Sequence, residues 1–313
     1  MKKRRILIFS ILLIIVSVTA ISSLLIRRGM IINEVRREEA VRLAEELRHT
    51  EEKAIHTAEE AAEKPAEDYR IASHVYSHRG VQGSYEHSFK AYDEAISAGS
   101  HNIEQDLVIS SDGVLFVSHD LDATFMTGVN ALYSSMTADE IDALKTRAGN
   151  KVLRLSEVFD RYGRSINYII ELKTADSTSV SAFGNIVDEY GYKDIITVQS
   201  VNTDVLRTLD EKYPDMPKLF LCKSQQSFYN SLEMPYVDIV SVSIDRGLMT
   251  ESNCEAAHEK GKLFSAWTLS MESSIRKAIG MNVDTYFTND TPLALSLERE
   301  YGLKARSQDK ESR

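Results

Sequence analysis

The chain has 313 residues and a formal net charge of −10 at pH 7, and all of the excess negative charge lies after residue 70. An acidic domain repels the phosphate backbone of nucleic acids, so the composition argues against a nucleic-acid partner. The part after residue 70 is long enough to bury one large core. Two cysteines, Cys222 and Cys254, lack metal-ligand spacing. This excludes a zinc-finger type of site and favours buried free thiols over a disulfide.

The first 32 residues have the pattern of a cytoplasmic tip and a transmembrane anchor. The run from Ile6 to Ile26 is apolar and uncharged, and at about 1.5 Å per residue it spans the roughly 30 Å hydrocarbon core of a bilayer. A signal-peptidase site near Ala20 is the alternative, but the apolar run continues beyond it, which favours a retained anchor. Basic residues precede the run and others follow it, so orientation is less clear. We expect a single-pass protein of the cell membrane with its main domain outside the cell.

Residues 33–66 are rich in Glu, Ala and Arg and contain no glycine and no proline before Pro65. Helical spacing of the apolar positions and i,i+4 charge pairs predict a charged helical stalk here. A dimeric coiled coil is the alternative, but most of the apolar positions are alanine, so we expect weak dimerisation at most. Residues 301–313 form a polar C-terminal tail.

From residue 72 onward, short β-rich runs alternate with helical patterns. The runs that have the composition of buried strands are 73–77, 101–108, 168–172, 195–199, 218–222, 237–244, 263–268 and 285–288. Helical patterns between them cover 88–98, 203–212, 252–260 and 271–280. Regular alternation of buried strands and helices indicates a parallel sheet. Eight such units in about 230 residues predict a TIM (β/α)₈ barrel, which we place at residues 67–300.

One further apolar run, 114–118, does not fit this alternation. It is joined to the second strand by four residues that end in Asp112-Gly113, a hairpin turn too short for a parallel crossover. We therefore expect a hairpin over 107–119 that returns His119 towards the second strand. A covering segment, 121–167, should follow with two short helices. The first is capped by Thr137 with Glu140 three residues later, and the second begins near Ser156.

Polar residues fall at the carboxyl ends of the predicted strands, where barrel enzymes place their chemistry. They are His78 and Arg79 after the first strand, Glu104 and Asp106 in the second, Glu171 and Lys173 in the third, Gln199 in the fourth and Trp267 in the seventh. Glu104 and Asp106 are two residues apart in a strand, so both point the same way. Two such carboxylates repel each other unless a cation lies between them. We therefore predict one divalent cation, Mg²⁺ or Ca²⁺, with Glu171 as the third oxygen ligand.

Each of these residues also has a structural alternative. A glutamate in an apolar run is often the partner of a buried ion pair, here with Lys173 or Arg79. A lone histidine at a strand end is usually structural, but His78 and His119 form a pair beside carboxylates, which favours proton transfer. We expect no part in the chemistry for His49, His56, His74, His87, His101 and His258. Trp267 is more often a core residue than a substrate wall.

The ordered set of motifs resembles the glycerophosphodiester phosphodiesterase family. The family pattern runs H-R-G, P-E-N-T, I-E-x-D-V, D-G-V, H-D, E-x-K, Q-S-F, W-T and T-D-x-P. This chain has, in the same order, His78-Arg79-Gly80, Tyr85-Glu86-His87-Ser88, Ile103-Glu104-Gln105-Asp106-Leu107, Asp112-Gly113-Val114, His119-Asp120, Glu171-Leu172-Lys173, Gln199-Ser200-Val201, Trp267-Thr268 and Thr288-Asn289-Asp290-Thr291-Pro292. The departures are Tyr85, His87, Val201 and one extra residue in the closing motif. We expect them at the rim, where they affect substrate preference more than chemistry.

The resemblance implies a TIM barrel whose cation is held by Glu104, Asp106 and Glu171, with His78 and His119 as general acid and base. It implies that the glycerol hydroxyl beside the phosphate attacks phosphorus, and that water then opens the resulting cyclic phosphate. The products would be glycerol phosphate and an alcohol. Among the remaining residues, the resemblance gives phosphate binding to Arg79 and Lys173, a supporting role to Glu86 and substrate contact to Trp267.

The sequence leaves the substrate open between small deacylated phospholipids and a glycerol-phosphate polymer of the envelope. A related phosphodiesterase of the phospholipase C or lysophospholipase D type is the alternative among enzymes. A catalytically inactive, membrane-anchored binding protein is the alternative outside enzymes, and the complete set of histidines and carboxylates argues against it. Metal-dependent turnover separates these possibilities.

Overall fold

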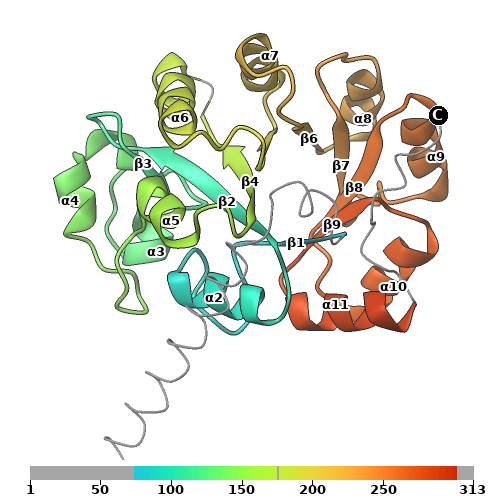
Figure 1. The fold of residues 1–313 in the computed structure, drawn as a ribbon, viewed down its shortest axis with the longest axis horizontal. Helices are drawn as coiled ribbons and strands as arrows, with labels where there is room; N and C mark the ends of the chain where they lie inside the picture. The colour runs from blue at the N-terminus through green and yellow to red at the C-terminus, as the bar shows by residue number, and fades with distance from the viewer. Residues whose placement is uncertain (1–73, 175, 302–313) are drawn as a thin grey trace, which may run out of the picture. The chain divides into compact units, whose positions relative to one another are not determined.

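A computed structural model describes residues 74–174 and 176–301. Its eight parallel strands are β1 (Val75–Ser77), β2 (Asn102–Ile109), β4 (Asn167–Leu172), β5 (Ile196–Ser200), β6 (Lys218–Cys222), β7 (Ile239–Ser243), β8 (Leu263–Trp267) and β9 (Thr285–Thr288). The strands pair in chain order, and β1 pairs with both β9 and β2, which closes the barrel (Figure 1). The predicted TIM-barrel fold is confirmed.

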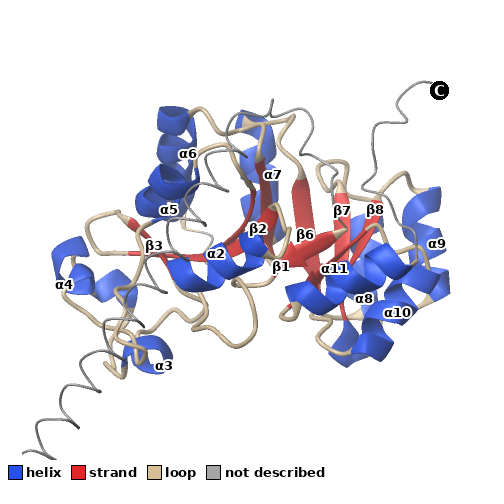
Figure 2. Ribbon diagram, turned by 60° about the horizontal axis from the view of Figure 1, so that its bottom comes forward, coloured by secondary structure: helices blue, strands red, loops and turns tan. Residues whose placement is uncertain are grey.

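The helices that follow the barrel strands lie outside the ring of strands (Figure 2). They are α2 (Phe89–Ser97), α6 (Ser177–Tyr190), α7 (Thr203–Lys212), α8 (Gln225–Leu232), α9 (Glu251–Glu259), α10 (Glu272–Gly280) and α11 (Thr291–Glu300). The main apolar core fills the space between strands and helices. A second cluster, which includes Tyr76, Ile169, Leu219 and Phe287, fills the inside of the barrel. Buried strand faces on both sides explain why the strands are continuous apolar runs.

The predicted hairpin is also present. Strand β3 (Leu115–Val117) pairs antiparallel with β2, with Leu107 opposite Val117. Gly113 forms the turn with a φ of 87°, a conformation that glycine adopts without steric cost. The hairpin brings the chain back along β2, so that the residues after Val117 return towards the middle of that strand.

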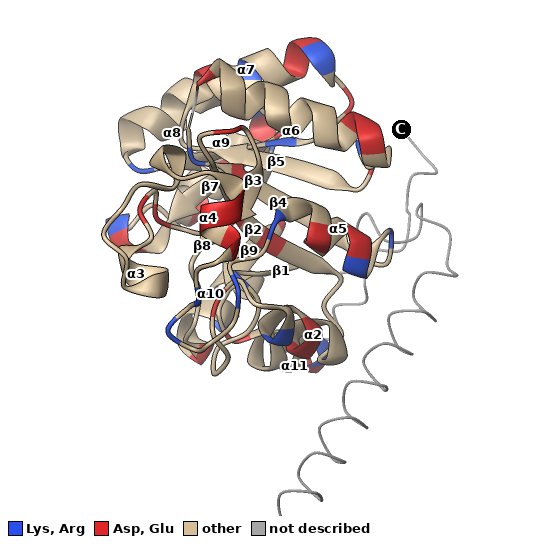
Figure 3. Ribbon diagram, turned by 90° about the vertical axis from the view of Figure 1, so that its left-hand side faces the viewer, with Lys and Arg blue, Asp and Glu red and all other residues tan. Residues whose placement is uncertain are grey.

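The covering segment contains the two predicted short helices and two elements that were not predicted. These elements are α3 (Thr124–Thr127), the 3₁₀ turn η2 (Tyr133–Ser135), α4 (Ala138–Asp142) and α5 (Leu155–Tyr162). The capping box of Thr137 and Glu140 starts α4 as predicted. The segment packs on the hairpin through its own apolar cluster, in which Phe116 and Tyr133 are buried. Acidic residues dominate α4 (Figure 3).

The predicted anchor, the stalk and nearly all of the polar tail lie outside the described residues. Within residues 74–174 and 176–301, no helix has the length and apolar character needed to cross a membrane. Both cysteines are buried and free, as expected. Burial raises the pKa of Cys222 to about 12 and that of Cys254 to about 11, so neither is a reactive thiolate near neutral pH.

Candidate active site

Strand register brings the acidic residues to one level of the barrel. Asp106 of β2 is the partner of Glu171 in β4, and Glu171 is the partner of Gln199 in β5. Glu104 lies two residues before Asp106 on the same face of β2, and both side chains are about 1% exposed. The predicted carboxylate cluster of Glu104, Asp106 and Glu171 therefore forms, above the apolar cluster that fills the barrel.

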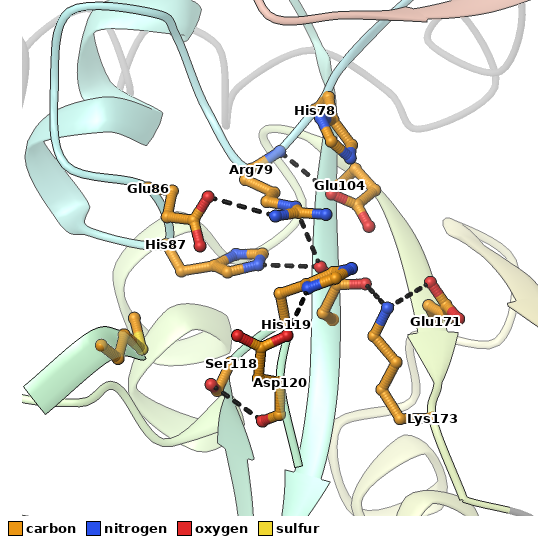
Figure 4. Close-up of polar contacts among 12 residues, drawn as sticks. His78, Arg79, Glu86, His87, Glu104, Ser118, His119, Asp120, Glu171 and Lys173 are labelled. Atoms are coloured by element: carbon orange, nitrogen blue, oxygen red, sulfur yellow. Dashed lines mark hydrogen bonds and ion pairs between the residues drawn. The ribbon is translucent and has the colours of Figure 1, made fainter. Parts of the chain in front are cut away.

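The loop after β1 aims Arg79 at these carboxylates. Gly80 has a φ of 103°, and a Cβ atom there would lie 2.5 Å from Cβ of Ala91 in α2, so glycine is needed for this close approach. The backbone N–H of Arg79 donates to Oε2 of Glu104 at 3.0 Å. The guanidinium Nη1 lies 3.1 Å from Oε2 of Glu86, and Nε lies 3.2 Å from Oδ2 of Asp106 (Figure 4).

Lys173 and Gln199 complete the contacts of the carboxylates. Lys173 Nζ lies 2.8 Å from Oδ1 of Asp106 and 2.7 Å from Oε2 of Glu171. The side-chain amide of Gln199 donates to Oε1 of Glu104 at 3.0 Å. The ion pairs that were the structural alternative for these residues thus exist, and they leave three buried carboxylates facing only two cationic side chains.

The charge excess is visible in the pKa values of the cluster. Burial and the neighbouring Asp106 raise the pKa of Glu104 well above its usual value, and they raise the pKa of Glu171 to about 7. Burial also opposes ionisation of Asp106. However, a hydrogen bond from His87 and the charge of Lys173 hold its pKa well below the usual range. Asp106 is therefore the ionised member of the group. The negative charge that Glu104 and Glu171 would carry is not fully compensated by neighbouring cationic side chains.

His78 and His119 line one cavity of about 110 Å³ together with Glu104, Glu171 and Lys173. Burial and the charge of Arg79 lower the pKa of His78 to about 3, so its ring is neutral near pH 7. The side chain of His119 is 39% exposed, and its Nδ1 lies 2.9 Å from Oδ1 of Asp120. Figure 4 shows both rings directed into the group of side chains from β2 and β4. The two predicted proton carriers therefore share one site.

His87 does not lie where the sequence placed it. Its side chain is fully buried, with Nε2 3.0 Å from Oδ2 of Asp106 and Nδ1 3.0 Å from the hydroxyl of Tyr92. The expectation that the departures from the family pattern lie at the rim is wrong for this residue. That His87 takes no part in the chemistry stays a prediction. The signal was available in part, because His87 follows Glu86 in the loop that returns past Arg79.

Two further residues of the site were missed or left without a role. Asn289, directly after β9, places Oδ1 2.7 Å from Nδ1 of His78. Gln199 was placed at a strand end but given no partner. Trp267 lines the cavity, and its contact with substrate stays a prediction. Among the described residues no group accepts a hydrogen bond from its buried Nε1. Glu86 contacts Arg79 rather than the other carboxylates.

Comparison with known proteins agrees with this geometry. Residues 78–293 match the model of the Glycerophosphoryl diester phosphodiesterase family. The chain belongs to this family. It is therefore a phosphodiesterase by descent, and the matched range begins at His78 and includes every residue of the site described above.

Individual relatives are distant. A glycerophosphodiester phosphodiesterase of Bacillus subtilis is 24% identical over 253 residues, covering 72% of this chain and 86% of the relative. The human lysophospholipase D GDPD1 is 26% identical over 166 residues, covering 48% of this chain and 52% of the relative.

Solved structures share the fold of this phosphodiesterase. A putative glycerophosphoryl diester phosphodiesterase of Silicibacter pomeroyi superposes with a TM-score of 0.66 at 22% identity, covering 75% of this chain and 96% of the other. A phosphodiesterase of Oleispira antarctica, solved with the product sn-glycerol-3-phosphate, has a TM-score of 0.66 at 17% identity, covering 71% and 95%. At this level of identity the structures establish the barrel fold.

Proposed function

We propose that the protein hydrolyses glycerophosphodiesters to glycerol phosphate and an alcohol, with a divalent cation and through a cyclic phosphate. The observation that carries the proposal is that His78 and His119 line one cavity with Glu104, Glu171 and Lys173. Two histidines that can carry protons, carboxylates that can bind a hard cation, and the ammonium group of Lys173, which can neutralise a phosphate, are thus present together. Membership of the family and the product named for the Oleispira antarctica structure support this substrate class.

The donor set fits a hard divalent cation, Mg²⁺ or Ca²⁺. Glu104, Asp106 and Glu171 would hold it through carboxylate oxygens, and the raised pKa values of the two glutamates mark negative charge that Arg79 and Lys173 leave uncompensated. The buried Oε1 of Gln199 also has no hydrogen-bond partner among the described residues. When bound, the cation would supply charge neutralisation for the phosphate oxygens.

His87 supports this cation site without being a ligand in the proposal. Its ligand atom lies within 4.8 Å of those of Glu104 and Asp106, so it is a candidate by distance. However, both ring nitrogens already have partners, Asp106 and Tyr92. Burial lowers the pKa of His87, so the neutral ring donates through Nε2 to the carboxylate and accepts through Nδ1 from the phenol. A donor in this place orients a carboxylate ligand.

The two histidines would carry the protons of both steps. In the first step, one histidine accepts the proton of the glycerol hydroxyl beside the phosphate while the hydroxyl oxygen forms a bond to phosphorus. The other donates a proton to the oxygen of the leaving alcohol as its bond to phosphorus breaks. In the second step, water attacks the cyclic phosphate and gives its proton to the histidine that had donated. The first histidine returns its proton to the glycerol oxygen, so both regain their starting states.

The proposal is tested with the purified full-length protein and a panel of glycerophosphodiesters, with phosphorus NMR to identify the products. We expect glycerol phosphate and free alcohol with Mg²⁺ or Ca²⁺, and loss of turnover in excess chelator. Glu104→Gln should lose both activity and cation binding. Glu298→Gln is the matched control, because Glu298 is a buried glutamate of α11 that contacts Tyr286. Full activity in chelator, or no turnover of any substrate in the panel, would refute the proposal.

A lysophospholipase D type of activity is the second candidate, and one observation favours it. Four apolar side chains that follow His119 closely in the chain are exposed: Leu121 by 46%, Phe125 by 60%, Val129 by 39% and Leu132 by 52%. Four exposed apolar side chains within one short stretch of chain fit contact with a lipid chain. Comparing lysophosphatidylcholine with glycerophosphocholine, in wild type and in Phe125→Ser, separates the two activities. A selective loss with the lysolipid supports this candidate, and an equal effect on both substrates removes it.

We also propose that the enzyme is anchored in the cell membrane with the barrel outside. The support is in the sequence alone, in the apolar run Ile6–Ile26 and the basic residues before it. In that location a glycerol-phosphate polymer of the envelope, or a lipid-derived diester, becomes the substrate within reach.

A further inference from the structure

The end of β9 and the residue that follows it hold the ring of His78 from several sides. The backbone N–H of His78 donates to the carbonyl of Thr288 at 2.9 Å. The ring packs edge-on against Phe287, with centroids 6.5 Å apart. Its Nδ1 lies 2.7 Å from Oδ1 of Asn289, and Nδ2 of Asn289 in turn donates to Oγ of Ser270 at 3.0 Å. Three consecutive residues, Phe287 to Asn289, thus fix the position and orientation of the His78 ring.

This arrangement decides which ring nitrogen carries the proton. A neutral imidazole has one N–H and one lone pair, and the partner of one nitrogen sets the state of the other. An amide oxygen can only accept, so Nδ1 of His78 must donate to Asn289. Nε2 then carries the lone pair, and among the residues that the structure describes no group donates to it. His78 also lines the reaction cavity.

Asp290, the acidic residue of the closing motif, does not perform this task. Its carboxylate accepts from the backbone N–H of Leu293 and caps α11. The extra residue of the closing motif is therefore not a change at the rim, because it separates a helix cap from the contact to His78. The contact to the ring is made by a neutral amide.

We propose that Asn289, oriented by Ser270, is a positioning residue that holds His78 in the Nδ1–H tautomer, so that Nε2 accepts the proton of the glycerol hydroxyl in the first step. This rests on the function proposed above for the role of that proton, but the tautomer itself does not. The other histidine of the pair, His119, has a carboxylate partner, Asp120. Burial and the charge of Lys173 lower the pKa of His119, and the contact with Asp120 opposes this by favouring the protonated ring that gives up a proton.

A neutral partner keeps the base neutral. The charged or titratable groups that act on His78 are Arg79 from its own loop, Asp106 from β2 and His87 from the loop before α2. Arg79 opposes protonation of the ring, whereas Asp106 favours it. A carboxylate in place of the Asn289 amide would add a second group that favours the protonated form, which cannot accept a proton.

The test is the tautomer of His78 in the full-length protein labelled with ¹⁵N-histidine. Long-range ¹H–¹⁵N spectra at pH 8 distinguish a protonated from an unprotonated ring nitrogen, and the His78 signals are those absent from His78→Gln. We expect the Nδ1–H form in wild type and a mixture of both forms in Asn289→Ala. Turnover of glycerophosphodiesters by Asn289→Ala should fall by roughly 10- to 100-fold, the scale of losing a partner that orients a catalytic ring, with little change in KM.

Asn289→Asp distinguishes this orientation of the amide from the reversed one. A carboxylate can still accept from Nδ1. Because burial lowers the pKa of His78 to about 3, we expect the ring to stay neutral at pH 8 even beside the carboxylate, the Nδ1–H form to persist, and turnover to exceed that of Asn289→Ala. If the amide were reversed and donated to Nδ1, Asp could not replace it and would be the worse variant. Ser270→Ala should have a smaller effect of the same kind. Asn150→Asp, an exposed asparagine, is the control for the substitution itself.

An Nε2–H form in wild type would overturn the proposal, and so would an unchanged tautomer and turnover in Asn289→Ala. The spectra need no turnover, so the tautomer can be established even if no glycerophosphodiester is a substrate. In that case the proposed function fails while the positioning by Asn289 stands.

Discussion

Cation binding should be coupled to the release of a proton from Glu171. The pKa of this carboxyl is raised to about 7 by burial and by the neighbouring Asp106. A protonated carboxyl cannot bind a cation with both oxygens, so the cation must displace the proton and its affinity must fall as the pH is lowered. Asp106 makes no contribution in this range, because its pKa is already held well below the usual value.

The size of the effect follows from the pKa. A group with a pKa of about 7 is about nine-tenths ionised at pH 8 and about one-hundredth ionised at pH 5. The apparent affinity for Ca²⁺ should therefore fall by about 100-fold between pH 8 and pH 5, which is about 2.7 kcal/mol. Glu104, whose pKa is raised well above its usual value, adds to this fall and gives it the same sign.

Isothermal titration calorimetry of the full-length protein with Ca²⁺ measures both the affinity and the protons released. Titrations at pH 5, 6, 7 and 8, each in two buffers of different ionisation enthalpy, give the proton count directly. Glu171→Gln should bind weakly at pH 8 and lose much of the pH dependence. Glu298→Gln is the matched control, because burial also raises the pKa of Glu298 to about 7. An affinity that does not change between pH 5 and pH 8, or an equal effect of the control variant, would refute the reasoning.

Three further outcomes are expected. In steady-state kinetics, His78→Ala and His119→Ala should each lower kcat by roughly 10² or more. The double variant should lose less than the product of the two single losses, because the pair acts as a unit. Wild-type turnover in either single variant removes that residue from the mechanism. Lys173→Met removes an ammonium 2.8 Å from Asp106, so calorimetry should show tighter Ca²⁺ binding while kcat/KM falls; weaker binding would contradict this. External protease on intact cells should release a fragment that begins near Pro65; a barrel cut only after lysis would show the opposite orientation.

Most of the barrel could be predicted because its determinants are local. Strands buried on both faces are short apolar runs, and the bounds of such runs can be seen in the sequence. The predicted bounds of β6 and β9 agree with the structure. The distance between successive runs leaves room for a helix, which indicates the alternation of a barrel. The hairpin followed from Asp112-Gly113, which only a tight turn explains. Helices α6, α8 and α11 were not singled out. In α8, the serine and asparagine residues have weak helix propensity, so packing decides its structure. The short elements α3 and η2 lack any periodic signal.

The carboxylate cluster could also be predicted, because strand geometry fixes it. Residues two apart point the same way, and neighbouring parallel strands place Asp106 beside Glu171 once their ends are known. The same reasoning gave His78 and Arg79 as residues at the end of a strand. It gave no information on which loop side chains return to contact them, because a loop conformation depends on packing that no local pattern records.

The contacts of His87 and Asn289 were missed for that reason. The two residues have one feature in common: each reaches a residue of the site from a loop. Asn289 is 211 residues from the histidine that it contacts, and His87 reaches Asp106 from a loop in which it has a φ of 53°. Each contacts a side chain for which a catalytic or cation-binding role is proposed, and neither is among the residues that line the cavity. Such a residue needs only to donate or accept one hydrogen bond at the correct place, so an amide, an imidazole or a carboxylate can serve. We therefore expect the residues that face the cavity to tolerate less change than those behind them. At position 87, a histidine that departs from the family pattern makes a contact of this kind, with Asp106.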